Sequence, residues 1–131
     1  MKLLKYIVTL FIVASTSLVA QEHAVSLLDS KLNQFFNIRD FCMSENGQEA
    51  FFSIQSPDGK ISQIVSMIHE NDEWSVPELM FFCDEYSYLE PFLTCDGKRL
   101  FFVSDMPNSS SKEGKRNFDI WYIERNAPGT V

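Results

Sequence analysis

The sequence predicts an all-β fold made of two similar antiparallel units. From Phe35 onward, short apolar runs alternate with polar turns, and β-branched and aromatic residues are frequent. No long stretch repeats its apolar residues every 3.6 positions, as a core helix would. The stretch "RDFCMSENGQEAFFSIQ" (residues 39–55) is matched at an offset of fifty by "EPFLTCDGKRLFFVSD" (residues 90–105). Both stretches combine an apolar run, a turn with glycine and a Phe-Phe pair.

The first twenty residues have the layout of a secretory signal peptide. Lys2 and Lys5 precede the apolar run "YIVTLFIVASTSLVA", which ends in small residues at Ala20. The run is shorter than the roughly 20 residues of a membrane-spanning helix. We therefore expect an exported protein, periplasmic or extracellular, with no transmembrane span in its mature chain. An uncleaved N-terminal anchor is the alternative.

The charge of the mature chain disfavours one class of partner. After cleavage at Ala20 the chain keeps nine basic and eighteen acidic residues, a net charge of about −9. Such a chain repels phosphate backbones, so nucleic acid is not expected to bind. The acidic residues are scattered along the sequence, as on a solvated surface.

The first unit, residues 35–82, follows a leader at residues 21–34 in which apolar spacing allows one short turn or helix. Pro77 cannot donate to a strand ladder, so the last strand of this unit should lie at a sheet edge. The turns "SENGQ", "SPDG" and "ENDE" separate the expected strands, which are residues 40–43, 49–54, 62–69 and 74–80.

The second unit, residues 83–131, repeats the order of the first but is incomplete. Its expected strands are residues 89–94, 99–104 and 118–124, and a fourth strand is missing before Val131. The first two strands match the first unit at an offset of fifty. The third matches at fifty-six, with Ile64 aligned to Ile120, because the preceding loop is longer.

The turn residues are expected to be structural. Asn46-Gly47 aligns with Asp96-Gly97. Asp96 can accept backbone N–H bonds within its own turn, and Gly97 can adopt a positive φ without steric cost. The Phe-Phe pairs after both turns are expected to pack in the core, since successive strand residues point to opposite faces.

Four short strands per unit of roughly fifty residues is also the period of a β-propeller blade. In addition, "EPFLTCDGKRLFFVSD" followed by "FDIWYIER" resembles the WD40-like β-propeller repeat of TolB-type exported bacterial proteins. The resemblance covers residues 89–125 well and residues 39–77 more weakly, and "EWSVPELM" resembles the outer-strand segment of that family. It implies propeller blades that act as interaction platforms of the cell envelope.

Two dipeptides depart from the pattern of that family. Thr94-Cys95 stands where serine-proline is usual, and Glu45-Asn46 replaces proline-aspartate. The glycines of both turns are kept.

The chain holds fewer than two complete units, while propellers use about four to eight blades. The missing blades would come from a longer chain or from self-association, including a ring of several copies.

The sequence contains no recognisable catalytic, cofactor or metal motif. His23 and His69 have no partner at metal-ligand spacing, and the three cysteines match no zinc pattern. Cys42 is expected to be a buried small hydrophobe, and Cys83 with Cys95 is the more plausible pair if a disulfide forms. No G-x-S-x-G elbow occurs.

The loop from Met106 to Asn117, the longest non-repeating piece, is the candidate for partner binding, because loops on a rigid scaffold often carry recognition. The alternative is a polar insertion without a role. The residues proposed to contact a partner are Asn108, Lys112, Lys115 and Arg116.

Two functions fit these observations. The first is a non-catalytic exported propeller segment that binds a protein or a cell-envelope component. The alternative is the N-terminal propeller part of a larger hydrolase, a serine peptidase or a glycan-processing enzyme, whose catalytic residues lie outside this chain. The fold alone does not choose between them.

Overall fold

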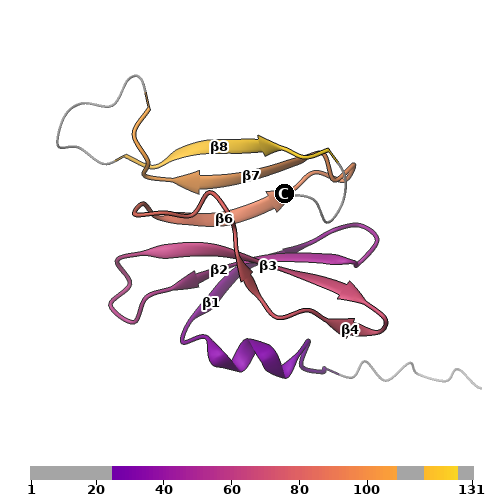
Figure 1. The fold of residues 1–131 in the computed structure, drawn as a ribbon. Coiled ribbons are helices and arrows are strands. Elements are labelled where there is room, and N and C mark those ends of the chain that lie inside the picture. The colour runs from indigo at the N-terminus through magenta and orange to yellow at the C-terminus, as the bar shows by residue number, and fades with distance from the viewer. Residues whose placement is uncertain (1–24, 109–116, 127–131) are drawn as a thin grey trace, which may run out of the picture.

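The computed structural model describes residues 25–108 and 117–126, and it confirms an all-β fold built from antiparallel sheets (Figure 1). A short 3-10 helix, η2 (Ser30–Gln34), precedes the strands and lies in the predicted leader. The first sheet contains β1 (Ile38–Met43), β2 (Glu49–Gln55), β3 (Ser62–Glu70), β4 (Glu73–Trp74) and β5 (Glu78–Leu79). The second contains β6 (Tyr88–Leu93), β7 (Arg99–Ser104) and β8 (Asp119–Glu124).

The expected fourth strand of the first unit is split in two. Both β4 and β5 pair with β3, and the chain leaves the sheet between them at residues 75–77. Pro77 has no N–H to donate, which explains the break at the edge of the sheet. Next to the break, Ser75 still makes two hydrogen bonds to β3. Its Oγ accepts the N–H of Ile68 at 2.9 Å, and its own N–H donates to the Ile68 carbonyl at 2.7 Å.

The two sheets share one pairing pattern. Cys42 lies opposite Phe51 in the first sheet, and Phe92 lies opposite Phe101 in the second, so these pairs differ by fifty. The third strand follows the offset of fifty-six, since Ser53 faces Ile64 while Val103 faces Ile120. The offsets read from the sequence are thus those of the strand registers.

A bulge repeats at the same place in both units. The register shifts between Arg39 and Cys42 in β1 and between Leu89 and Phe92 in β6. The bulged residues Asp40 and Glu90 have φ of 55° and 56°. A positive φ is uncommon outside glycine, so two such residues fifty positions apart indicate one shared backbone design. At Glu90 the bulge directs the N–H to the Oγ of Ser53 in the first sheet, 3.1 Å away.

Three turns use the same set of hydrogen bonds. In the turn after β6, the Gly97 N–H donates to the Thr94 carbonyl at 2.8 Å. The Thr94 hydroxyl and the Lys98 N–H both donate to Oδ1 of Asp96, at 2.6 and 3.1 Å. This confirms the role predicted for Asp96. The turns at residues 44–49 and 56–61 repeat these bonds around Asn46 and Asp58.

The glycine in each turn has a positive φ, as predicted. The values are 70° at Gly47, 72° at Gly59 and 68° at Gly97. Asn46 is not among the residues with positive φ, so the Asn46-Gly47 turn is longer than the two-residue hairpin that this dipeptide often forms.

The sheets pack face to face but diverge from one side. Strand β6 lies against β1, β2 and β3, and the rest of the second sheet spreads away from the first (Figure 1). The segment that joins the two units fills the resulting wedge, with Met80 buried and Phe82 stacked on Phe102 at 4.6 Å between ring centroids. The buried residues of this core are Phe51, Ile64, Met80, Tyr88, Leu93, Leu100 and Phe102.

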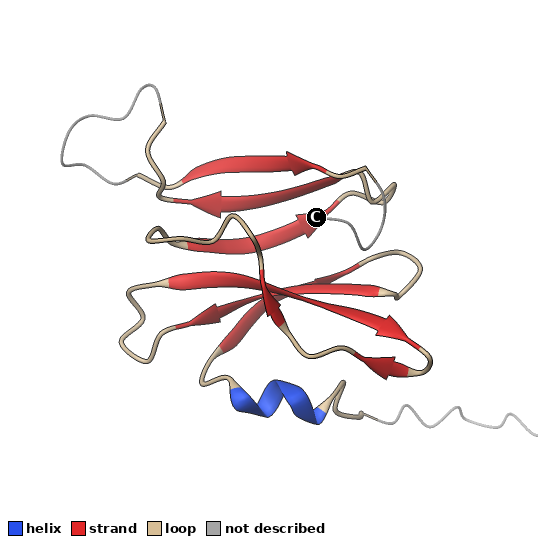
Figure 2. Ribbon diagram, in the orientation of Figure 1, coloured by secondary structure: helices blue, strands red, loops and turns tan. Residues whose placement is uncertain are grey.

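A second core covers the opposite face of the first sheet. Its buried residues are Ala50, Phe52, Val65, Met67 and Trp74. The 3-10 helix lies over this face, on the side away from the second sheet (Figure 2). Phe35 meets Phe52 edge-on at 6.0 Å, Leu32 packs beside them, and Nζ of Lys31 donates to the Trp74 carbonyl at 2.8 Å. We call residues 30–35 the N-terminal cap.

We expect Gly97→Val to lower the free energy of unfolding by about 1–3 kcal/mol, because a β-branched residue resists a positive φ. No heavy atom lies within 4 Å of the position of an added Cβ, so the loss would come from backbone strain rather than from a clash. Gly97→Asn is the control, since asparagine tolerates this conformation. Urea unfolding of both variants measures the effect, and equal stability of Gly97→Val and the parent would show that the turn assignment is wrong.

Candidate interaction surface

The outer face of the second sheet is apolar and uncovered by the described residues. Phe92, Ile120 and Tyr122 are 61%, 77% and 54% exposed, and Phe101 and Val103 are half-buried among them. We call these five residues the open face. A shallow depression of about 450 Å³ lies in its centre. Proteins often bind partners through contiguous exposed apolar patches, so this face is the candidate interaction surface.

The open face corresponds to the interface of the first unit. Phe101 and Ile120 are the equivalents of Phe51 and Ile64, which are 1% and 0% exposed between the two sheets. The expectation that both Phe-Phe pairs pack in the core is therefore wrong for Phe101. It lies on a face that the corresponding layer does not cover, whereas its neighbour Phe102 is buried.

The polar residues of this face differ from those of its counterpart. The equivalent of Arg99 is Glu49 and the equivalent of Val103 is Ser53, and both Glu49 and Ser53 are buried contacts between the sheets. On the open face, Arg99 instead pairs with Glu124 at 3.3 Å. Its guanidinium carbon lies 5.4 Å from the centre of the Tyr122 ring.

A buried ion pair joins the two units. Arg125 follows β8 and binds the carboxylate of Glu49 with both Nη atoms, and both side chains are almost fully buried. Nη1 of Arg125 also donates to the Gly97 carbonyl at 3.3 Å, and the guanidinium lies 5.2 Å from the centre of the Phe51 ring. Sequence reasoning missed this pair, because 76 residues separate its partners and their contact depends on how the two sheets stack.

The cysteines form no disulfide in the structure. Cys42, Cys83 and Cys95 are all free, so the suggested pairing of Cys83 with Cys95 is not observed. Burial raises the pKa of the Cys83 thiol to about 11, and burial also raises the pKa of the Cys42 thiol. Both thiols therefore stay protonated near neutral pH and act as small apolar groups against the core. Cys42 is half-buried rather than fully buried.

The ionisable groups of the connecting segment are structural. The Tyr88 hydroxyl donates to Oδ1 of Asp84 at 2.7 Å, which lowers the pKa of Asp84. Burial, with the Asp84 carboxylate, raises the pKa of Tyr88. Over residues 25–108 and 117–126, no three His, Cys, Asp or Glu side chains come close enough to hold a metal ion.

The predicted partner-binding loop is only partly described. Nδ2 of Asn108 donates to the Asp119 carboxylate and so ties the start of the loop to β8. The Met106 N–H donates to Oγ of Ser104 at 3.1 Å at the end of β7. Lys112, Lys115 and Arg116 lie outside the described residues, so their role stays a prediction.

Comparison with known proteins identifies no relative. No family model, no curated protein and no solved structure matches the chain. The resemblance to WD40-like propeller repeats therefore stays a hypothesis. Among the described residues, no helix has the length and apolar character needed to cross a membrane.

We expect Arg125→Met to cost about 3–5 kcal/mol of unfolding free energy, because it leaves the Glu49 carboxylate buried without its guanidinium. The double variant Glu49→Leu/Arg125→Met should lose less than Arg125→Met alone, since both charges are then gone. Urea unfolding of the parent, both single variants and the double variant gives the coupling. A double variant that loses the sum of the two single losses would mean that the pair is not coupled.

The turn aspartates should make stability depend on acid pH. Hydrogen bonds from the Thr94 hydroxyl, and then from the Lys98 N–H, hold the pKa of Asp96 below its ordinary value. A lowered folded-state pKa adds stability above the unfolded-state pKa of about 3.9, and this stability is lost as the pH falls through the folded-state pKa. Asp96→Asn should therefore reduce the loss of stability between about pH 4 and pH 2.

We expect Asp96→Asn to fold normally, because the equivalent turn at residues 44–49 already has asparagine at this position. Asn46 accepts the Ser44 hydroxyl at 2.7 Å and the Gln48 N–H at 3.1 Å, as Asp96 does with its own partners. Melting temperatures measured across this pH range test the prediction. An unchanged acid slope in Asp96→Asn, with the parent melting temperature at neutral pH, would argue against a folded-state shift at Asp96.

Proposed function

We propose that this chain is a non-catalytic exported binding module of the β-propeller type, which serves as a platform for a protein partner of the cell envelope. The open face of the second sheet carries this proposal. Its aromatic and aliphatic residues are exposed, yet the equivalent positions of the first unit are buried against a neighbouring sheet. A protein surface that covers these residues would complete the layer.

The arrangement of the sheets supports blade-like units. Each unit begins with the same antiparallel meander and the same bulge, and the divergence of the sheets from β6 resembles blades that fan out from an axis (Figure 1). In propellers, radial repetition of such sheets leaves only short edges. Loops at the ends of the strands would then offer further contacts, among them the loop that Asn108 ties to β8.

The proposed location rests on the sequence. Residues 1–20 combine two lysines, an apolar run and small residues in the order of a secretory signal. Export to the periplasm or the extracellular space would bring the open face into contact with envelope proteins. A mature N-terminus at Gln21 in the envelope fraction would support export, and an intact N-terminus at Met1 in the cytoplasm would contradict it.

Site-specific photo-crosslinking in intact cells tests the binding role. We expect a discrete protein adduct from a photoreactive residue at Ile120 or Phe92, because both side chains project from the open face. The same residue at Phe36, which is 78% exposed on the capped side of the molecule, should give no adduct. Mass spectrometry identifies the partner. Equal labelling from all three positions, or no adduct from the open face, would contradict the proposal.

A further inference from the structure

The two ends of the layered structure differ. Behind the first sheet lies the N-terminal cap, whereas no described residue covers the open face of the second sheet. From this difference we infer that the open face pairs with the open face of a second copy of this chain, which gives a closed two-fold dimer. This inference names the partner for the proposed function and rests on it.

The cap works against head-to-tail assembly. A ring or filament of copies would place the open face of one chain on the outer face of the first sheet of the next, as the second sheet lies on the first within one chain. That outer face is already covered by Leu32 and Phe35, and Lys31 is bonded to the Trp74 carbonyl at 2.8 Å. A head-to-tail contact would have to displace these residues, but a face-to-face contact displaces nothing described.

The polar pattern of the open face also disfavours a repeat of the internal interface. Within the chain, Glu49 receives Arg125, and Ser53 receives the N–H of Glu90. The equivalents on the open face are Arg99 and Val103, which cannot accept either bond. In a copy docked head to tail, the position equivalent to Arg125 is His69, at the offset of fifty-six, so the ion pair of Glu49 with Arg125 would not be reproduced.

A face-to-face pair brings Arg99 close to a carboxylate of the other copy. Arg99 lies opposite Glu124 at one end of the β7 register, and the exposed Glu90 lies toward the other end, beside Val103. A two-fold axis that lies in the contact plane and runs perpendicular to the strands reverses the strand direction of the second copy. The Arg99 end of one face therefore lies over the Val103 end of the other. Arg99 then approaches Glu90 of the second copy, while the aromatic and aliphatic residues meet in the centre.

The size of the face sets the expected strength. Three strands of six residues, about 4.8 Å apart and rising about 3.3 Å per residue, have a flat footprint of about 300 Å². A standard stable interface buries about 800 Å² on each partner. The dimer should therefore be weak and reversible, with a dissociation constant between about 10 μM and 1 mM.

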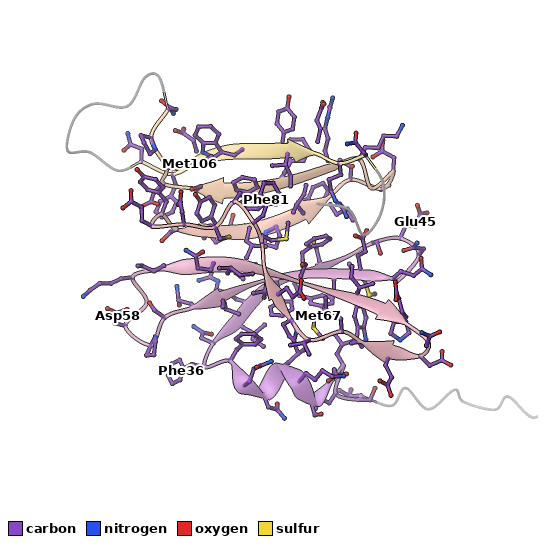
Figure 3. All side chains as sticks on the ribbon, in the orientation of Figure 1. Phe36, Glu45, Asp58, Met67, Phe81 and Met106 are labelled. Carbon is purple, nitrogen blue, oxygen red and sulfur yellow. The ribbon has the colours of Figure 1, made fainter. Side chains whose placement is uncertain are left out.

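Sedimentation velocity of the processed chain at about 0.15 M salt tests the inference. We expect a monomer–dimer equilibrium with no larger species. Ile120→Glu should weaken it at least about tenfold, because each copy then places a carboxylate in the apolar contact. Phe36→Glu is the matched control, since Phe36 and Ile120 are 78% and 77% exposed and Phe36 lies beyond the cap (Figure 3). It should change the dissociation constant less than about twofold.

The possible results separate the two proposals. A chain that stays monomeric to about 1 mM, or that forms a ladder of larger species, overturns the inference. Loss of association in Phe36→Glu rather than in Ile120→Glu overturns it as well, because the contact would then use the capped side. A monomeric chain that crosslinks to another protein through position 120 keeps the proposed function and removes only the dimer. Thermal unfolding of each variant confirms that the fold is intact.

Discussion

The need to cover both faces of each sheet governs this structure. The central strand β2 carries Phe51 and Phe52 side by side, and because successive residues point to opposite faces, each phenylalanine needs its own covering layer. The second sheet covers Phe51 and the N-terminal cap covers Phe52. In β7 the same pair is Phe101 and Phe102, but only Phe102 is covered. The order of the layers and the open face both follow from this requirement.

The contact between the sheets combines apolar burial with a few fixed polar bonds. Replacing a buried ion pair by apolar residues often costs little, so the pair of Glu49 and Arg125 is better viewed as a positioning contact than as a net source of stability. Together with the bond from Glu90 to Ser53, it fixes how the second sheet lies on the first. The open face lacks both groups, so another layer there must find its position by other contacts.

Much of the fold could be predicted from the sequence, because its signals are local. Turn glycines and alternating apolar runs predicted the strands, the two offsets predicted how the units correspond, and Pro77 predicted an edge position. The bulges could not be predicted, because Asp40 and Glu90 adopt a positive φ without the glycine that usually signals this conformation in a sequence. Nor could the pairing of Glu49 with Arg125, which depends on how the sheets stack.

The open face itself was hidden from sequence reasoning for a physical reason. A Phe-Phe pair in a strand predicts that both faces are covered, but the sequence of one unit does not state whether its neighbouring layer is present. The net charge of about −9 of the processed chain opposes contact between copies, yet at physiological salt such repulsion fades beyond about 8 Å. The hydrophobic attraction between the two open faces acts only at contact, and salt does not screen it because it is not an interaction between charges. The chain can thus stay dispersed when dilute and still present a face that pairs when chains are brought close together.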